Sequence, residues 1–358
     1  MTGPRDPGAG PAVVSVAPSD RAAVSSWFDA LTRGLGAGRD DPPPYTLAET
    51  AADLSVPREH TRVHALLALA DGLPAGAARL ELPARDNTRL LSFRLAVPPE
   101  LRGRGIGNAL HRAITATAAH EGRTSLLTHL DLPLNGPSGP GAAFAAARGY
   151  TLRNTELRQR LRLPVDEGRL RRLAAPTPAA ADCRIVSWSG RCPDRYARRY
   201  ASLRGMLLGE APTGALSLEA ERWDVDRLRA EERLDERQGR TVVTSMALAP
   251  DGSTAGHTIL AAGPGGHAFQ RDTLVLPSHR GHGLGIVLKA VNLLRLQRDA
   301  PSTVAVETTN ATQNTPMRAI NDRLGFTALE RCEDWQRDAP IPQPATPEGG
   351  GDGPPAQL

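Results

Sequence analysis

The chain contains the same glycine-rich string twice. PPELRGRGIG runs from Pro98 to Gly107, and PSHRGHGLG runs from Pro277 to Gly285. Each copy follows a short β-like run and precedes a helix-like segment. Because glycine has no Cβ, successive backbone N–H groups of such a loop can converge at a helix N-terminus, where the dipole also favours an anion. The copies lie too far apart for a solenoid repeat, so the sequence predicts one duplicated domain with two anion-binding loops.

The length of 358 residues allows two domains that each bury a core. The stretch LAAPTPAAAD, from Leu173 to Asp182, is rich in Ala and Pro and predicts a linker. We therefore expect an N-terminal domain over residues 12–172 and a C-terminal domain over residues 183–338. The Gly- and Pro-rich ends, residues 1–11 and 339–358, are expected to be disordered.

Hydrophobic spacing predicts a similar order of elements in both halves. In each half, strands precede the glycine-rich loop, and a helix, a strand, a second helix and a final strand follow it. The expected strands before the loops are 63–70, 76–82 and 90–97 in the first half, and 183–188, 241–248, 256–262 and 269–276 in the second. This order predicts an α/β (α+β) fold whose mixed sheet has, in each half, an antiparallel meander and one parallel pair.

Composition excludes several classes of protein. The net charge is +4, but Lys289 is the only lysine, and the arginine content is typical of codon bias rather than of a nucleic-acid partner. The three cysteines, Cys183, Cys192 and Cys332, have no metal-ligand spacing and indicate a reducing compartment without disulfides. No apolar run is long enough to cross a membrane. We expect a soluble, cytoplasmic monomer or homodimer with no metal, no membrane partner and no nucleic-acid partner.

The repeated string shares glycines with three kinds of phosphate-binding loop. A dinucleotide fingerprint needs a third glycine where this chain has Asn108 and Ile286. A P-loop needs Gly-Lys-Ser/Thr, which neither copy has. The pattern that fits is Arg-x-x-Gly-x-Gly after a strand that ends in Val-x-Pro.

On the strings VPPELRGRGIG, VLPSHRGHGLG and TTNATQNTPMRAINDRLGF, the chain resembles the GNAT (Gcn5-related N-acetyltransferase) superfamily. The resemblance covers residues 12–338, in a tandem form like that of mycothiol synthase, and implies two consecutive acyl-CoA-binding domains. The loops would hold the pyrophosphate, and the strands before them would bind the pantetheine arm and polarise the thioester carbonyl. The cofactor-binding residues that it implies are Leu274, Val275, Leu276, Arg280, Gly281, His282, Gly283, Leu284, Gly285 and Asn310 in the second half, and Leu95, Ala96, Val97, Arg102, Gly103, Arg104, Gly105, Ile106 and Gly107 in the first.

The catalytic positions depart from the family pattern. Many members place a Tyr four residues before the final Gly-Phe/Tyr, as the acid for the leaving thiolate, but this chain has Asn321 and Ala145 there. The family's base Glu is also replaced, by Phe269 and Leu91.

Other side chains must therefore supply the chemistry. Glu307, at the end of a strand, is the first candidate for the base, and Asp272 is the second; both have the alternative of being ordinary strand carboxylates. Asn314 matches a family Asn that contacts pantetheine or sulfur, although Asn also favours a helix cap. Asn310 fits a turn as well as a cofactor contact.

The resemblance implies an acetyl-CoA-dependent N-acetyltransferase that acts on the amine of a small metabolite. The first half lacks the Asn-containing helix start, so we expect the chemistry in the second half, with the first half binding cofactor structurally or shaping the acceptor pocket. Two alternatives stay open. One is a mycothiol-synthase-like acetylation of a cysteinyl amine, and the other is a non-catalytic acyl-CoA-binding protein.

Overall fold

The computed structural model describes residues 10–42, 46–56, 58 and 60–338. Apart from Gly10 and Pro11, the two tails for which disorder is expected lie outside the described residues. Among the residues that are described, no helix is long and apolar enough to cross a membrane.

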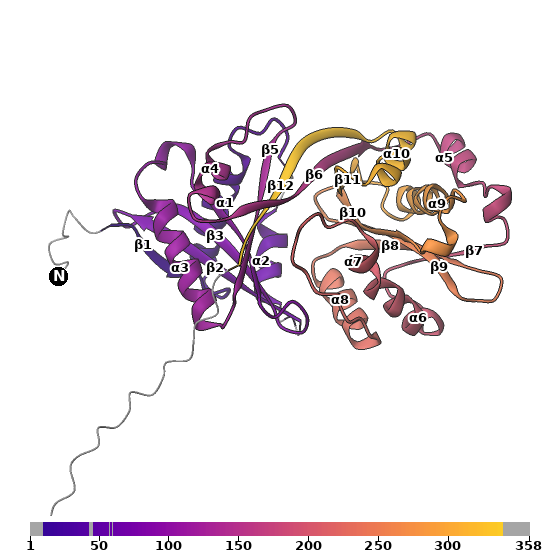
Figure 1. Ribbon diagram of the computed structural model, residues 1–358, viewed down its shortest axis with the longest axis horizontal. Coiled ribbons are helices and arrows are strands. Elements are labelled where there is room, and N and C mark those ends of the chain that lie inside the picture. Colours follow the sequence, from indigo (N-terminus) through magenta and orange to yellow (C-terminus); the bar gives the residue numbers. More distant parts are fainter. Residues whose placement is uncertain (1–9, 43–45, 57, 59, 339–358) are drawn as a thin grey trace, which may run out of the picture.

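The first half of the chain supplies the indigo-to-magenta part of Figure 1. Its strands are β1 (Ala12–Ser15), β2 (Thr61–Ala70), β3 (Leu73–Pro83), β4 (Leu90–Ala96), β5 (Ser125–Pro133) and β6 (Thr151–Arg162). Its α-helices are α1 (Arg21–Gly36), α2 (Leu47–Ser55), α3 (Ile106–His120), α4 (Pro140–Ala146) and α5 (Glu167–Ala174). Two 3-10 turns, η1 (Pro99–Leu101) and η2 (Pro178–Ala180), complete the described part of this half and the segment after it.

The second half repeats this order. Its strands are β7 (Arg184–Ser189), β8 (Thr241–Leu248), β9 (Thr254–Ala262), β10 (His267–Val275), β11 (Ala305–Ala311) and β12 (Thr327–Asp338). Its α-helices are α6 (Asp194–Gly205), α7 (Leu207–Glu210), α8 (Val225–Arg237), α9 (Leu284–Asp299) and α10 (Thr315–Leu324), and the 3-10 turn η3 spans Pro277–His279.

All the strands belong to one 12-stranded sheet, in the order β1-β2-β3-β4-β5-β12-β6-β11-β10-β9-β8-β7. The last strand of each half has changed places with that of the other. The strand β12 pairs antiparallel with β5 of the first half, and β6 pairs antiparallel with β11 of the second. Figure 1 shows β12 and β6 running between the two halves. The halves are therefore joined by main-chain hydrogen bonds and not only by a linker.

Each half has a central parallel pair that separates partway along. In the first half β4 pairs with β5 from Leu90 to Phe93, and in the second β10 pairs with β11 from His267 to Phe269. Beyond these residues the parallel pairing ends, although β4 and β10 keep their antiparallel partners on the other side. Both halves thus contain an opening between two strands, followed directly by the glycine-rich loop.

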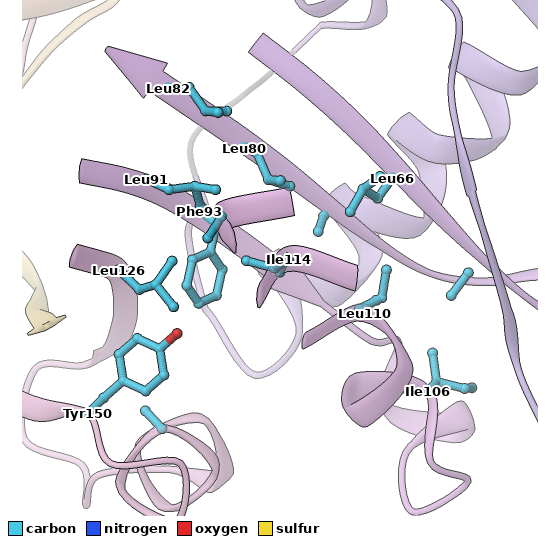
Figure 2. Packing of buried hydrophobic residues seen from close by; sticks show 14 of the residues in the cluster. Leu66, Leu80, Leu82, Leu91, Phe93, Ile106, Leu110, Ile114, Leu126 and Tyr150 are labelled. Carbon is cyan, nitrogen blue, oxygen red and sulfur yellow. The ribbon is translucent and has the colours of Figure 1, made fainter. Parts of the chain in front are cut away.

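Helices cover both faces of the sheet and enclose several apolar cores. In the first half, the cluster that includes Ile106, Leu110 and Ile114 of α3 packs against β2, β3 and β4, as Figure 2 shows. A second cluster around Trp27 lies under α1 on the other face. In the second half the main clusters lie under α9 and under α6 with α8.

The mixed α/β sheet with one parallel pair in each half confirms the predicted fold class. The exchange of terminal strands was not predicted. It also assigns β6 and α5 to the core of the second half, where Leu161 and Leu170 are buried with residues of α9. In the expected linker, Leu173 and Ala174 end α5, and Ala180 is buried against Leu284 and Leu288. The domain limits themselves stay a prediction.

Candidate active site

The glycine-rich loop of the first half leaves its backbone open. Gly105 is the N-cap of α3 with a φ of +79°, and Gly103 has a φ of +76°. A Cβ added at either glycine would have no atom within 4 Å. The Nε of Arg102 donates to the carbonyl oxygen of Val97 over 3.1 Å, which ties the loop to the end of β4. This geometry leaves room beside the first N–H groups of α3 for a diphosphate.

A cavity of about 780 Å³ begins at this loop and follows the opening between β4 and β5. Its walls include most of the first-half residues that the resemblance implied for cofactor binding. Those that line it are Leu95, Ala96, Val97, Arg102, Gly103, Gly105, Ile106 and Gly107; Arg104 does not. The sequence-predicted loop and strand therefore lie side by side along one cavity.

The corresponding loop of the second half has the same backbone but different surroundings. Gly281 and Gly283 have φ values of +79° and +77°, and the Nε of Arg280 donates to the Val275 carbonyl oxygen over 2.9 Å. The other end of the Arg280 guanidinium, however, is paired with Glu210 at 2.7 Å. A carboxylate beside an anion-binding loop disfavours a diphosphate there.

The linker segment adds a second obstruction at this loop. The Oγ1 of Thr177 donates to the carbonyl oxygen of His282 over 2.6 Å. A Cβ added at Gly283 would lie 3.0 Å from the Cγ2 of Thr177. The implied residues Leu274, Val275, Leu276, Gly281 and Gly283–Gly285 are thus brought together as one loop and strand end, but beside Glu210 and Thr177.

Two titratable side chains line the inner part of the first-half cavity. The Nε2 of His111, from α3, lies 3.2 Å from the hydroxyl oxygen of Tyr150, which stands just before β6. Burial, with Arg337 and Arg148 nearby, lowers the pKa of His111 to about 4. Burial raises the pKa of Tyr150 to about 12. Both groups are therefore neutral near pH 7, and Tyr150 retains a proton that it can donate.

The Tyr150 ring is fixed by its neighbours. It packs edge-on against Phe93 and His111, with ring centroids 6.0 and 5.8 Å apart, respectively. Figure 2 shows Tyr150 beside Phe93 and Leu126 in the core of this half. The family's usual tyrosine position is Ala145, which lines the same cavity. A different residue therefore brings a phenol to the cavity.

Polar side chains also border the opening between β4 and β5. They lie on the face of the sheet that α1 covers. The Nδ1 of His129 lies 2.8 Å from Asp334 of the exchanged strand β12, and its Nε2 lies 3.2 Å from Asp131. Asp131 also accepts from Arg39 at 2.9 Å and from Arg94 at 2.7 Å. His129, Asp131 and Arg39 line the cavity.

The charges of His129, Asp131 and their ion-pair partners offset one another. Burial and Arg94 act to lower the pKa of His129, but its hydrogen bonds to Asp131 and Asp334 outweigh them and hold that pKa well above its ordinary value. Burial acts to raise the pKa of Asp131, but Arg94 and His129 hold it well below its usual range. His129, Asp131 and Cys332 place their ligand atoms within 4.8 Å of one another, as metal ligands do. Because both ring nitrogens of His129 already bind carboxylates, these residues serve each other as partners.

The structure places Glu307 in an ion-pair network and does not support it as the base. Its side chain is 1% exposed, and its oxygens accept from Arg158 and Arg160. A base needs a free lone pair that the substrate can reach. The sequence could not show this, because both arginines lie on β6, which reaches β11 only through the strand exchange.

Asp272 lies in a bulge of β10, where the register with β9 shifts between Gln270 and Thr273. Its carboxylate is 3.0 Å from Arg204 of α6. Burial raises the pKa of Asp272, although Arg204 opposes the effect. This bulge distinguishes the second half, because the described pairing of β3 with β4 is regular.

The remaining predicted residues have local partners. Asn314 is the N-cap of α10 and accepts from the Met317 N–H over 3.3 Å, as a helix cap does. The amide of Asn310 donates to Thr308 over 3.1 Å. Asn321, at the family's tyrosine position, accepts from the buried Nζ of Lys289 over 2.6 Å. A role for any of these side chains toward a cofactor stays a prediction.

Sequence reasoning missed His111, Tyr150 and His129. His111 occupies the same position after its N-cap glycine as Lys289 does in the second copy, and this alignment of the two copies was the one signal for it. Nothing in the sequence placed Asp334 beside His129, since the two lie in different halves.

The fold and the site define an acyltransferase. The model of the Acetyltransferase (GNAT) family matches residues 24–140. Mycothiol acetyltransferase of Salinispora arenicola (strain CNS-205) is 30% identical over 328 residues, which cover 89% of this chain and 95% of that protein. Mycothiol acetyltransferase of Acidothermus cellulolyticus (strain ATCC 43068 / DSM 8971 / 11B) is 29% identical, over 73% of this chain and 76% of that one.

Among solved structures, a tandem GNAT protein from the clavulanic acid biosynthesis pathway superimposes with a TM-score of 0.74 at 30% identity. The match covers 92% of this chain and 99% of that one. The chain belongs to the GNAT acetyltransferase family, in its tandem form, and is an acyltransferase.

Proposed function

We propose that the protein transfers an acetyl group from acetyl-CoA to the amine of a small metabolite, and that the first half holds the acetyl-CoA. The cavity of about 780 Å³ that joins the open loop to the β4–β5 opening carries this proposal. It reverses the sequence-based expectation that the chemistry takes place in the second half. The second-half loop, with Glu210 and Thr177 against it, is the poorer site for a diphosphate.

The residues of the first half then have distinct roles. The N–H groups that follow Gly105 would bind the diphosphate, and the free edge of Leu95–Val97 would bind the pantetheine arm. Acetyl-CoA supplies a thioester, whose carbonyl carbon an amine attacks and whose sulfur leaves. Tyr150 holds a proton at its phenol oxygen for that sulfur. His111, in the tautomer that donates from Nε2, stabilises the phenol oxygen as the proton leaves.

The proton balance of the transfer is closed. The thiol gains a proton from Tyr150 as the C–S bond breaks, and the proton that the amine loses as the amide forms restores the phenol.

One observation favours the second half as the location of the chemistry. The bulge at Arg271 and Asp272 can free backbone N–H groups next to the β10–β11 opening, where they could polarise a carbonyl. The two relatives named mycothiol acetyltransferase favour a cysteinyl amine as a second candidate acceptor. The cysteines Cys183, Cys192 and Cys332 are free, which supports a reducing, cytoplasmic location. A monomer or homodimer without a nucleic-acid partner stays our prediction.

A calorimetric titration with acetyl-CoA tests the proposal. We expect saturable binding with one molecule per chain, and product formation with a panel of small amines. The absence of binding by well-folded protein, or two equivalent sites per chain, would contradict it.

A further inference from the structure

Arginine is the commonest residue in the lining of a groove between the two halves. We call this cavity of about 550 Å³ the inter-half groove. One wall comes from α2, β2 and β3 of the first half, and the other from α8 and β10 of the second. Seven arginines and three carboxylates line it. The arginines are Arg58, Arg79, Arg227, Arg233, Arg237, Arg240 and Arg271, and the carboxylates are Asp53, Glu231 and Asp235.

The carboxylates of the inter-half groove are already neutralised. Asp53 binds both Arg58 and Arg79, and Asp235 binds Arg271 and lies 3.6 Å from Arg240. Each of these acids is therefore shared by two guanidinium groups. Glu231 binds Arg204 and Arg271, and Arg227 binds Asp86 and Glu221. Among the described residues of the wall, Arg233 and Arg237 are therefore the arginines without an acidic partner.

Two of these arginines are available to a ligand. Arg233 and Arg237 are exposed on α8, and within the described ranges neither has an ion-pair or hydrogen-bond partner. They are four residues apart, so they lie on the same side of the helix. Two guanidinium groups on one edge of a concave, positively charged surface match a carboxylate or a phosphate, which arginine binds through paired N–H groups.

The inter-half groove lies next to the proposed acyl-transfer site. It shares Asp53, Arg79 and Arg240 with a second cavity of about 290 Å³. The second cavity shares Leu35 with the first-half cavity of about 780 Å³. Arg94, on the wall of the second cavity, binds Asp131, on the wall of the first-half cavity. The three cavities therefore adjoin one another through shared lining residues, from the β4–β5 opening to the arginines of α8.

We infer that the acceptor is an amine that also carries a carboxylate or phosphate group, and that the inter-half groove binds this anionic group while the amine reaches the β4–β5 opening. This inference rests on the proposed function for the position of the reacting amine. It assigns Arg233 and Arg237 to acceptor recognition. A neutral amine, with nothing to bind these residues, would be the poorer substrate.

Binding to the groove can be measured separately from acetyl-CoA binding. Trp223 lines the groove, and its ring lies 4.4 Å from the Arg227 guanidinium, so its fluorescence reports on the arginines. We would titrate inorganic phosphate and, separately, malonate into protein saturated with acetyl-CoA, and subtract the response of W223F. We expect a saturable change that the double variant R233Q/R237Q weakens about tenfold. The matched control R112Q/R198Q removes two exposed arginines of α3 and α6 and should bind as the wild type does.

Turnover then tests the acceptor class. Amines that carry a carboxylate or phosphate on a chain long enough to cross the second cavity would be compared with the same amines carrying an amide or a hydroxyl group instead. We expect R233Q/R237Q to lower kcat/KM about tenfold for the anionic member of a pair, and to leave the neutral member and the KM for acetyl-CoA unchanged. The stronger of the carboxylate and phosphate responses identifies the anionic group. Equal turnover of charged and neutral amines by the wild type, or an unchanged anion titration in R233Q/R237Q, overturns the inference. If the wild type binds the anions but does not bind acetyl-CoA, only the proposed function is overturned.

Discussion

Alanine at Gly105, compared with alanine at Gly283, decides which half binds acetyl-CoA. Both glycines are N-caps in the left-handed region, with φ values of +79° and +77°. An L-residue there costs about 1–2 kcal/mol of strain, and this cost is common to both variants. The two variants differ in the surroundings of the added methyl group. At Gly105 it enters open space beside the loop amides, whereas at Gly283 it meets the Cγ2 of Thr177 at 3.0 Å.

The expected effect at Gly105 follows from the hydrogen bonds at stake. A methyl group at this position displaces an anion from at least one backbone N–H. A hydrogen bond to a charged oxygen contributes about 1.5–3 kcal/mol, so the Kd for acetyl-CoA should rise about 10-fold to 100-fold in G105A. G283A should lose more stability, because its methyl group also presses on Thr177, while its Kd stays within about twofold of the wild type.

Calorimetric titration with acetyl-CoA measures both constants, and thermal unfolding shows whether each variant is folded. Weak binding by G283A together with wild-type binding by G105A would refute our choice of the first half. It would return the site to the loop that the sequence favoured. Equal losses in both variants would show that both loops bind acetyl-CoA.

Three further variants test single residues. Y150F should lower kcat roughly 100-fold without changing the Kd for acetyl-CoA, since general acids typically contribute a factor of this order; an unchanged kcat would remove Tyr150 as the acid. E307Q should lower the free energy of unfolding by about 1–3 kcal/mol, because Arg158 and Arg160 lose this carboxylate but keep Glu330 and Asp41, respectively. Its pH–rate profile should keep the wild-type shape, whereas loss of the acidic limb, which reports protonation of the base, would restore Glu307 as the base. Burial lowers the pKa of Lys289 to about 7, while an unfolded lysine titrates near 10.4. Between about pH 7 and 10 the unfolded chain binds the extra proton, so the free energy of unfolding should rise with pH by up to about 1.4 kcal/mol per pH unit, and urea titrations of K289M should lack this slope.

Much of the fold was predictable because its information is local. Turn residues and apolar positions place β8 at the bounds predicted from sequence, Thr241–Leu248. The exchange of β6 and β12 was not predictable. Both strands have the pattern expected for the last strand of a half, and that pattern does not say which of two similar edges a strand joins.

In the candidate site, too, the local features were predictable from sequence and the long-range contacts were not. The loop from Arg102 to Gly107 is a continuous string whose glycines have a direct backbone meaning, so it was found from sequence. The surroundings of the base candidates could not be read from sequence, because an exposed strand-end carboxylate and a buried ion pair look alike there. Glu307 became the second kind only when β6 brought two arginines to it.

The strand exchange also explains why a half with an obstructed loop still matters for the site. The strand β12 carries Asp334 to His129, and it carries Glu330 to Arg39, whose guanidinium also binds Asp131. These contacts fix three residues on the wall of the first-half cavity, and two of their partners come from the second half of the chain. The second half further supplies the α8 wall of the inter-half groove. The first-half site is therefore complete only when both halves are folded, because the sheet that holds it is built from strands of each.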